Sequence, residues 1–159
     1  AQEFAKGAAD AGNKVEFVSL RGKKIAFCTG CLGCQKKGRC VIKDDANEIA
    51  EKMKSADVIV FATPIYYYEM SGQLKTMLDR ANSLYVSDYK FREISLLATA
   101  ADTDKKAMNI AKRGISGWIA CFEGVKFKGG VCGTGAEVAG DVKKMPLLLK
   151  RVYTMGKKV

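Results

Sequence analysis

Apolar and polar residues along this chain form two kinds of pattern that follow one another in turn. Apolar residues spaced three and four positions apart, as on one face of a helix, predict five helices, at residues 1–11, 44–54, 71–84, 104–122 and 141–157. Short stretches rich in apolar residues predict four strands, at residues 15–20, 57–62, 94–99 and 129–133. Strands that alternate with helices in this way are typical of a parallel sheet with helices on both faces. The predicted fold class is therefore α/β, a three-layer sandwich built on a parallel sheet.

The chain opens inside a predicted helix, although an α/β unit normally begins with a strand. The turn from that strand into its helix is the usual site for a phosphate group. We therefore expect a first strand and a phosphate loop to precede residue 1. Because no internal repeat, long linker or low-complexity segment interrupts residues 1–159, we expect a single domain that is incomplete at its N-terminus.

The formal net charge is +10, from 27 Lys and Arg residues against 17 Asp and Glu residues. The basic residues are spread along the chain, and no nucleic-acid-binding module accompanies them. We interpret them as a solvated basic surface and expect no nucleic-acid partner. No apolar run approaches the length of a membrane span, and the N-terminus lacks a signal-peptide pattern. We therefore expect a cytoplasmic protein without a membrane contact.

The chain contains no histidine, which excludes several kinds of active site. Neither a Ser-His-Asp triad nor a Cys-His pair can form, and no His-dependent zinc or haem site is possible. Electron or hydride transfer is more easily reconciled with this composition, because a bound cofactor then performs the chemistry. We therefore predict no catalytic side chain.

The loop after the strand at 57–62 is the leading candidate for a ligand site. In open α/β sheets, ligands bind beyond the carboxyl ends of the strands. Tyr66, Tyr67 and Tyr68 together offer aromatic faces and hydroxyl groups to a flat heteroaromatic ligand. Ser71 and Gly72 open the next helix, whose first N–H groups can donate to carbonyl oxygens. The alternative is a structural turn whose tyrosines pack against the core.

The sequence around this loop resembles a family signature. Residues 62–80 read ATPIYYYEMSGQLKTMLDR. They are similar to the Ser/Thr-Pro-hydrophobic-Tyr…Leu-Lys…Leu-Asp-Arg signature of the NAD(P)H-dependent FMN reductases, which have a flavodoxin-like fold and include the iron–sulfur flavoproteins. The likeness covers nearly the whole chain. It implies a flavodoxin-like FMN-binding domain, with NAD(P)H as electron donor and a homo-oligomeric assembly.

The resemblance also implies where the cofactor lies. Residues 64–72 are expected to contact the isoalloxazine ring, and residues 99–102 to lie near the flavin or its ribityl chain. The predicted cofactor-binding set is Thr63, Pro64, Ile65, Tyr66, Tyr67, Tyr68, Met70, Ser71, Gly72, Thr99, Ala100, Ala101 and Asp102. Asp79 and Arg80 are assigned to support of the fold.

Four cysteines, with C-x2-C-x2-C-x5-C spacing, form a second candidate site: Cys28, Cys31, Cys34 and Cys40. Thiolates this close together can enclose one soft metal centre, and the compact spacing favours iron–sulfur over a zinc ribbon. Disulfides are the weaker alternative in an intracellular enzyme. The spacing is similar to the cluster motif of iron–sulfur flavoproteins, which implies a [4Fe-4S] cluster. Zinc, and reduced thiols on a subunit-contact loop without metal, are the alternatives.

These expectations combine into an FMN-dependent oxidoreductase. NAD(P)H or a reduced carrier would deliver electrons to the flavin. A small acceptor such as a quinone, a flavin or a dye would receive them, either directly or through the cluster. One alternative is an electron-transfer protein that serves a redox protein partner, in the manner of a flavodoxin. Another is a basic nucleic-acid-binding domain with a zinc loop. The sequence has no dinucleotide-binding fingerprint that would distinguish NADH from NADPH.

Overall fold

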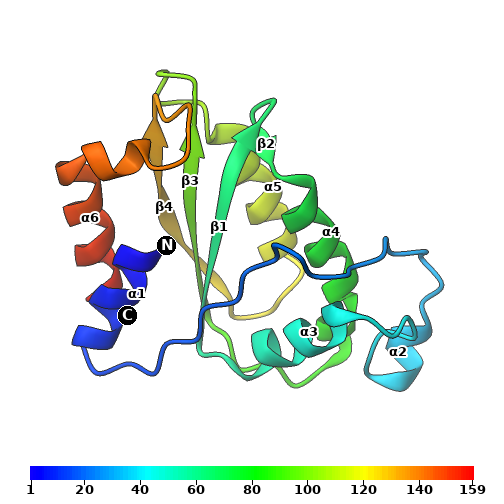
Figure 1. Ribbon diagram of the computed structural model, residues 1–159. Helices are drawn as coiled ribbons and strands as arrows, with labels where there is room; N and C mark the ends of the chain where they lie inside the picture. Colours follow the sequence, from blue (N-terminus) through cyan, green and yellow to red (C-terminus); the bar gives the residue numbers. More distant parts are fainter.

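Three parallel strands form the centre of the structure, a computed structural model that describes residues 1–159 (Figure 1). They are β1 (Val58–Tyr66), β3 (Glu93–Ala100) and β4 (Lys126–Thr134), and the sheet order is β2-β1-β3-β4. β2 (Glu69–Met70) has two residues and pairs antiparallel with the end of β1. Pro64 pairs with Thr99, and Thr99 in turn pairs with Gly133. The carboxyl ends of all three long strands therefore meet at one edge of the sheet.

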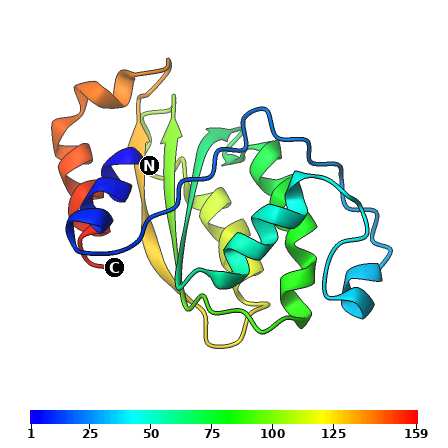
Figure 2. The same ribbon diagram turned by 60° about the horizontal axis from the view of Figure 1, so that its bottom comes forward.

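Helices cover both faces of this sheet (Figures 1 and 2). α1 (Gln2–Asp10) and α6 (Pro146–Gly156) lie on one face, where they enclose a small apolar cluster with β3 and β4. α3 (Asp45–Ser55), α4 (Gly72–Arg80) and α5 (Asn109–Ile119) lie on the other face, over the larger core. The predicted three-layer α/β architecture is confirmed. No helix combines the length and the apolar character needed to cross a bilayer.

α1 and α6 cross at unusually close range because each presents a glycine to the other. A Cβ atom built on Gly7 would lie 2.1 Å from the carbonyl oxygen of Tyr153. A Cβ atom built on Gly156 would likewise lie 2.1 Å from the carbonyl oxygen of Phe4. Real Cβ atoms do not approach a backbone atom this closely, so both positions need glycine at this helix separation.

The strand predicted at residues 15–20 is wrong. This segment is extended but pairs with no strand, and most of it is exposed, including Phe17 at 60%. An extended segment becomes a strand only when its N–H and C=O groups pair with a neighbour, and no such neighbour lies beside it in these 159 residues. The sheet therefore has three parallel strands and one short antiparallel strand, not four parallel ones.

The other predicted elements are present with changed boundaries. The helix predicted at 71–84 ends at Arg80 and continues as a 3-10 turn, η1 (Ala81–Val86). The helix predicted at 104–122 is shorter, and the one predicted at 141–157 is divided into η2 (Asp141–Lys144) and α6, which begins at Pro146. Proline favours the first turn of a helix, so its position determines this division. A short helix, α2 (Gly33–Lys37), lies in the cysteine region, where no helix was predicted.

Candidate functional site

The structure brings the two predicted flavin-binding segments together at the carboxyl edge of the sheet. β1 and β3 are neighbours, so residues 63–72 and residues 99–102 emerge side by side. The hydroxyl of Tyr68 donates a hydrogen bond of 3.0 Å to Oδ2 of Asp102, which ties the tip of one segment to the other. The family resemblance implied that both segments lie near the flavin. Contact of either segment with FMN stays a prediction.

Tyr67 and Tyr68 form the two-residue turn between β1 and β2, because Tyr66 pairs with Glu69. Their φ angles are +50° and +66°, the left-handed pattern of a type I′ hairpin turn. Bulky residues rarely adopt this conformation, and such outliers concentrate at functional sites. Tyr66, Tyr67 and Tyr68 are exposed to 61%, 100% and 51%. The alternative in which these tyrosines pack against the core is therefore wrong.

Residues beneath the turn support it. Oγ1 of buried Thr63 accepts a hydrogen bond of 2.9 Å from the N–H of Ser71 and donates one of 2.9 Å to the carbonyl of Pro64. The Ser71 hydroxyl caps α4 by accepting from the N–H of Leu74 at 3.4 Å. Thr63, Met70, Ser71 and Ala100 of the predicted set are all buried. They hold the loop in place, and Pro64 to Tyr68 with Gly72 present the outer surface.

The hydrogen bond between Tyr68 and Asp102 joins a protonated phenol to an ionised carboxylate. The backbone N–H of Asp104 donates to Asp102 at 2.8 Å and, together with the Tyr68 hydroxyl, lowers the pKa of that carboxyl group. The same carboxylate raises the pKa of Tyr68. At neutral pH, Tyr68 therefore acts as the donor, and its ring is oriented by this bond.

A groove of about 520 Å³ adjoins the tyrosine turn. This volume lies in the range of small-molecule sites. Tyr66, Gly72, Gln73 and Thr76 line one side, and Leu20, Lys23, Ile25 and Phe27 line the other. The N–H groups of Gly72 and Gln73 lie at the start of α4, where a helix offers no internal acceptor. The predictions missed the 20–27 side, because no local pattern shows that this segment runs past the end of β1.

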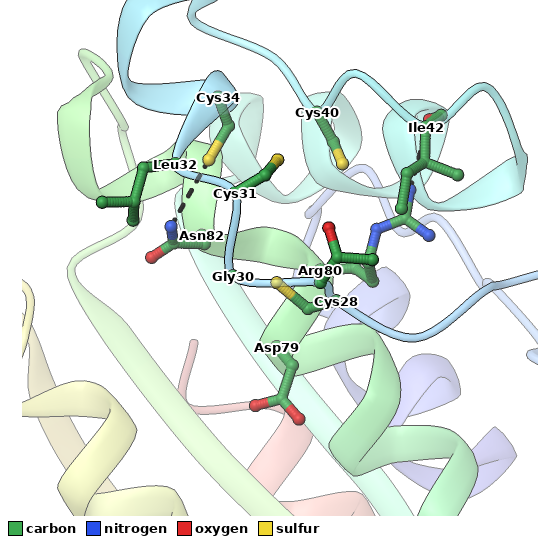
Figure 3. A pocket seen from close by; sticks show the side chains of 11 residues that line it. Cys28, Gly30, Cys31, Leu32, Cys34, Cys40, Ile42, Asp79, Arg80 and Asn82 are labelled. Atoms are coloured by element: carbon green, nitrogen blue, oxygen red, sulfur yellow. Dashed lines mark hydrogen bonds between the residues drawn. The ribbon is translucent and has the colours of Figure 1, made fainter.

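All four predicted cysteine ligands line one pocket (Figure 3). Cys28 and Cys31 are exposed, Cys40 is half-buried and Cys34 is buried, and all four are free thiols. Nδ2 of Asn82 donates to Sγ of Cys34 at 3.3 Å. In this conformation no three Cys, Asp or Glu side chains are close enough to bind a metal ion. The four predicted ligands thus share one pocket, and metal binding stays a prediction.

The chemistry of this pocket suits a soft metal centre. The N–H of Gly33 and the hydroxyl of Thr29 lower the pKa of the Cys31 thiol, which favours the thiolate that metals bind. Four sulfur donors on one short loop are the usual ligand set of iron–sulfur clusters. The residues present therefore fit such a group.

Arg80, the last residue of α4, closes the cysteine loop from inside. Its Nη1 donates to the carbonyl of Ala26 at 2.8 Å and to Oδ2 of Asp44 at 2.6 Å. Its Nη2 donates to the carbonyl of Ile42 at 3.2 Å and to Oδ1 of Asp44 at 2.9 Å. Ala26 and Ile42 lie two residues outside Cys28 and Cys40, so one guanidinium holds both ends of the loop. Arg80 supports the fold, as predicted from the sequence.

The ion pair of Arg80 with Asp44 is buried, with 0% and 10% of the two side chains exposed. Burial opposes the charge on Asp44, but hydrogen bonds from Arg80 and from the N–H groups of Ala26 and Ala46 outweigh it, and the pKa of Asp44 is lowered. The pKa of Arg80 is raised, chiefly by Asp44, against the effect of its own burial, and Cys40 contributes further. Cys40 therefore lies beside the guanidinium.

Comparison with known proteins gives a family match and several curated relatives that agree with the resemblance found in the sequence. The family model for NADPH-dependent FMN reductase matches residues 1–111. An iron-sulfur flavoprotein of Methanocaldococcus jannaschii is 40% identical over 85 residues, which are 54% of this chain and 44% of that protein. One of Archaeoglobus fulgidus is 42% identical over 96 residues, covering 57% of this chain and 49% of that protein. The chain thus spans about half the length of these curated relatives.

Solved structures share the fold. The NAD(P)H:quinone oxidoreductase from Methanothermobacter marburgensis superposes with a TM-score of 0.71 at 19% identity, over 98% of this chain and 84% of that one. Azoreductase AzrA superposes with a TM-score of 0.70 at 14% identity, over 99% of this chain and 89% of that one. At this level of identity the likeness concerns the fold alone, and it confirms the predicted flavodoxin-like class.

Proposed function

The chain belongs to the NADPH-dependent FMN reductase family, and on this premise we propose that it binds FMN and works as an NAD(P)H-dependent oxidoreductase. The electron acceptor is a small molecule such as a quinone, a flavin or a dye. The observation that carries the proposal is the exposed, left-handed tyrosine turn at the carboxyl edge of the sheet, beside a groove of about 520 Å³. Bound FMN supplies hydride and single-electron transfer at this position.

The residues of the turn have separate tasks in this proposal. Tyr66, Tyr67 and Tyr68 offer aromatic faces to a flat ring and exclude water from it. The free N–H groups of Gly72 and Gln73 donate to polar atoms of the ring. Thr63 holds the loop at its base through its two hydrogen bonds. No side chain has to act as a proton base, which agrees with the absence of histidine.

We extend the proposal to the cysteine loop, with a [4Fe-4S] cluster held by Cys28, Cys31, Cys34 and Cys40. Three observations support it: the shared pocket, the lowered pKa of Cys31 and the sulfur hydrogen bond from Asn82. The curated relatives that carry the name iron-sulfur flavoprotein add to this support. Such a cluster supplies one-electron transfer.

Purification without oxygen tests both cofactors. An absorption spectrum, FMN release on denaturation, and iron and sulfide analysis are measured on the same sample. FMN bound one to one, together with iron and sulfide, is the expected result. Bound zinc, or thiols without metal, would remove the cluster from the proposal and leave the flavin.

Steady-state oxidation of NADH and NADPH with a quinone or a dye tests the activity. Tyr66→Ala is expected to weaken FMN binding and to reduce turnover, because Tyr66 lines the groove. Tyr85→Ala is the matched control, since Tyr85 is also an exposed tyrosine, at 57%, but lies in η1. Equal losses in both variants would contradict the assignment of the groove.

An electron-transfer protein remains the second candidate function, because the cysteine loop could pass electrons to a redox protein. Reduction by a ferredoxin-like partner, without turnover of NAD(P)H and quinone, would favour it. We also retain a homo-oligomer as a proposal, supported by the fully exposed ring of Tyr67, which a second subunit could cover. Light scattering of the purified protein measures this state.

A further inference from the structure

Arg80 has one hydrogen-bond donor that the protein leaves unused. The side chain is fully buried, and its two Nη atoms make four hydrogen bonds to Ala26, Ile42 and Asp44. Its Nε is the one buried side-chain nitrogen or oxygen in the structure without a partner. A buried donor without an acceptor costs about 1–3 kcal/mol, and more on a charged group. No hydrogen bond in this structure supplies an acceptor to this N–H group.

The surroundings of Arg80 show which kind of acceptor fits. Arg80 lines the same pocket as Cys28, Cys31, Cys34 and Cys40 (Figure 3). Its Nη atoms are held by the two ends of the loop, so Nε is the N–H left for the pocket interior. Cys40 lies beside the guanidinium, and Asn82 already donates to the sulfur of Cys34. The pocket lining also includes Thr29 and Asp79, but Asp79 is already paired with Lys75, at 2.7 Å. The four cysteine sulfurs are the most numerous acceptors of the pocket that Arg80 lines.

We propose that Arg80 is a positioning residue that donates its Nε–H to a sulfur atom of the group held by the cysteine loop. The inference rests on the proposed iron–sulfur centre. Hydrogen bonds to cluster or cysteine sulfur stabilise the more negative, reduced state, and so raise the reduction potential. Arg80 thus has two roles: its Nη atoms close the loop, and its Nε adjusts the potential of the centre inside it.

Two variants separate these roles. Arg80→Lys keeps a positive charge opposite Asp44 but loses Nε–H and the forked contact with both ends of the loop. Asp44→Asn weakens the ion pair and leaves Nε in place. The two substitutions perturb the same buried contact, so general loosening of the loop would move both variants in the same direction.

The experiment labels arginine with ¹⁵N and measures the reduced protein by pulsed EPR, together with a redox titration of the cluster signal. We expect a weak ¹⁵N coupling in the wild-type protein, its loss in Arg80→Lys and its retention in Asp44→Asn. The midpoint potential should shift downward in Arg80→Lys and should not shift downward in Asp44→Asn. FMN content and unfolding temperature of each variant report on folding separately from these signals.

Each outcome decides the inference. A cluster without ¹⁵N coupling in the wild-type protein would overturn the role of Nε and leave the proposed function intact. An equal downward shift in both variants would assign Arg80 to loop closure alone. Absence of iron and sulfide from the anaerobic wild-type protein would overturn the cluster and this inference together. If Arg80→Lys does not fold, the ¹⁵N coupling in the wild-type protein and its retention in Asp44→Asn still decide whether Nε donates to the centre.

Discussion

Tyr67 provides a test that separates stability from function. Its side chain is fully exposed, so replacing it removes no packing, yet its φ of +50° is unfavourable for a bulky residue. The left-handed conformation costs an ordinary residue about 1–2 kcal/mol, and asparagine tolerates it better. Tyr67→Asn should therefore stabilise the FMN-free protein by about 0.5–1 kcal/mol. For a domain of this size, 1 kcal/mol corresponds to roughly 2–4 °C in Tm.

The same substitution should weaken FMN binding. An aromatic pair contributes about 0.5–1.5 kcal/mol beyond area burial, and its loss corresponds to roughly a two- to tenfold higher Kd. Thermal unfolding of the FMN-free protein and a fluorescence titration with FMN measure the two effects, with Tyr85→Ala as the control for an exposed tyrosine outside the groove. A lower Tm would show that the turn is not strained. An unchanged Kd would show that Tyr67 does not contact the ring.

Three further predictions concern the crossing of α1 and α6, the base of the tyrosine loop and the ion pair of Asp44 with Arg80. Gly156→Ala should destabilise the protein by about 1–3 kcal/mol in urea unfolding, because the new Cβ would meet the backbone of α1. As a control, Gly117→Ala, whose Cβ would lie in open space on α5, should stabilise the protein by about 0.5–1 kcal/mol. Thr63→Val should cost about 1–3 kcal/mol and weaken FMN binding, because the N–H of Ser71 loses its buried acceptor, whereas Thr63→Ser should retain both properties. Because the pKa of Asp44 is lowered on folding, its stabilising contribution is present above the ordinary Asp pKa of about 3.9 and is lost as pH falls through the folded value. The unfolding free energy should therefore decline below about pH 4, and less steeply in Asp44→Asn; equal slopes would contradict this assignment.

The sequence predicted those features of the fold that depend on local pattern. The apolar run before Thr63 defined β1. The helices predicted to start at residues 44 and 71 begin at Asp45 and Gly72, and the side chains of Asp44 and Ser71 cap them. The strand at 15–20 failed because strand formation depends on a partner as well as on local pattern. The alternation of apolar and polar residues at 15–20 is compatible with a strand, but no neighbouring strand pairs with this segment.

In the candidate sites, too, the sequence showed local features but not contacts between distant residues. The cysteine spacing identified four residues that share one pocket, but residues from a distant part of the chain, including Arg80 and Asn82, complete its lining. Nothing in the sequence shows that Arg80 reaches Asp44, 36 positions away, or that Asn82 meets Cys34, 48 positions away. The tyrosines were predicted to form a ligand surface, and this stays a prediction. Their left-handed turn was not predicted, because Tyr-Tyr lacks the Asn-Gly signature of type I′ turns.

α4 connects the two candidate sites as one rigid element. Ser71 caps its first turn beside the tyrosine loop, and Arg80 ends it inside the cysteine loop. Nine helical residues extend about 14 Å, so the helix sets the spacing between the two loops at roughly this length. Thr63 and Ser71 fix the tyrosine loop at its base, and Arg80 and Asp44, which lie outside residues 28–40, hold the cysteine loop. A substitution at either end of α4 that tilts the helix must therefore change the spacing of the two sites, even where it leaves each loop folded.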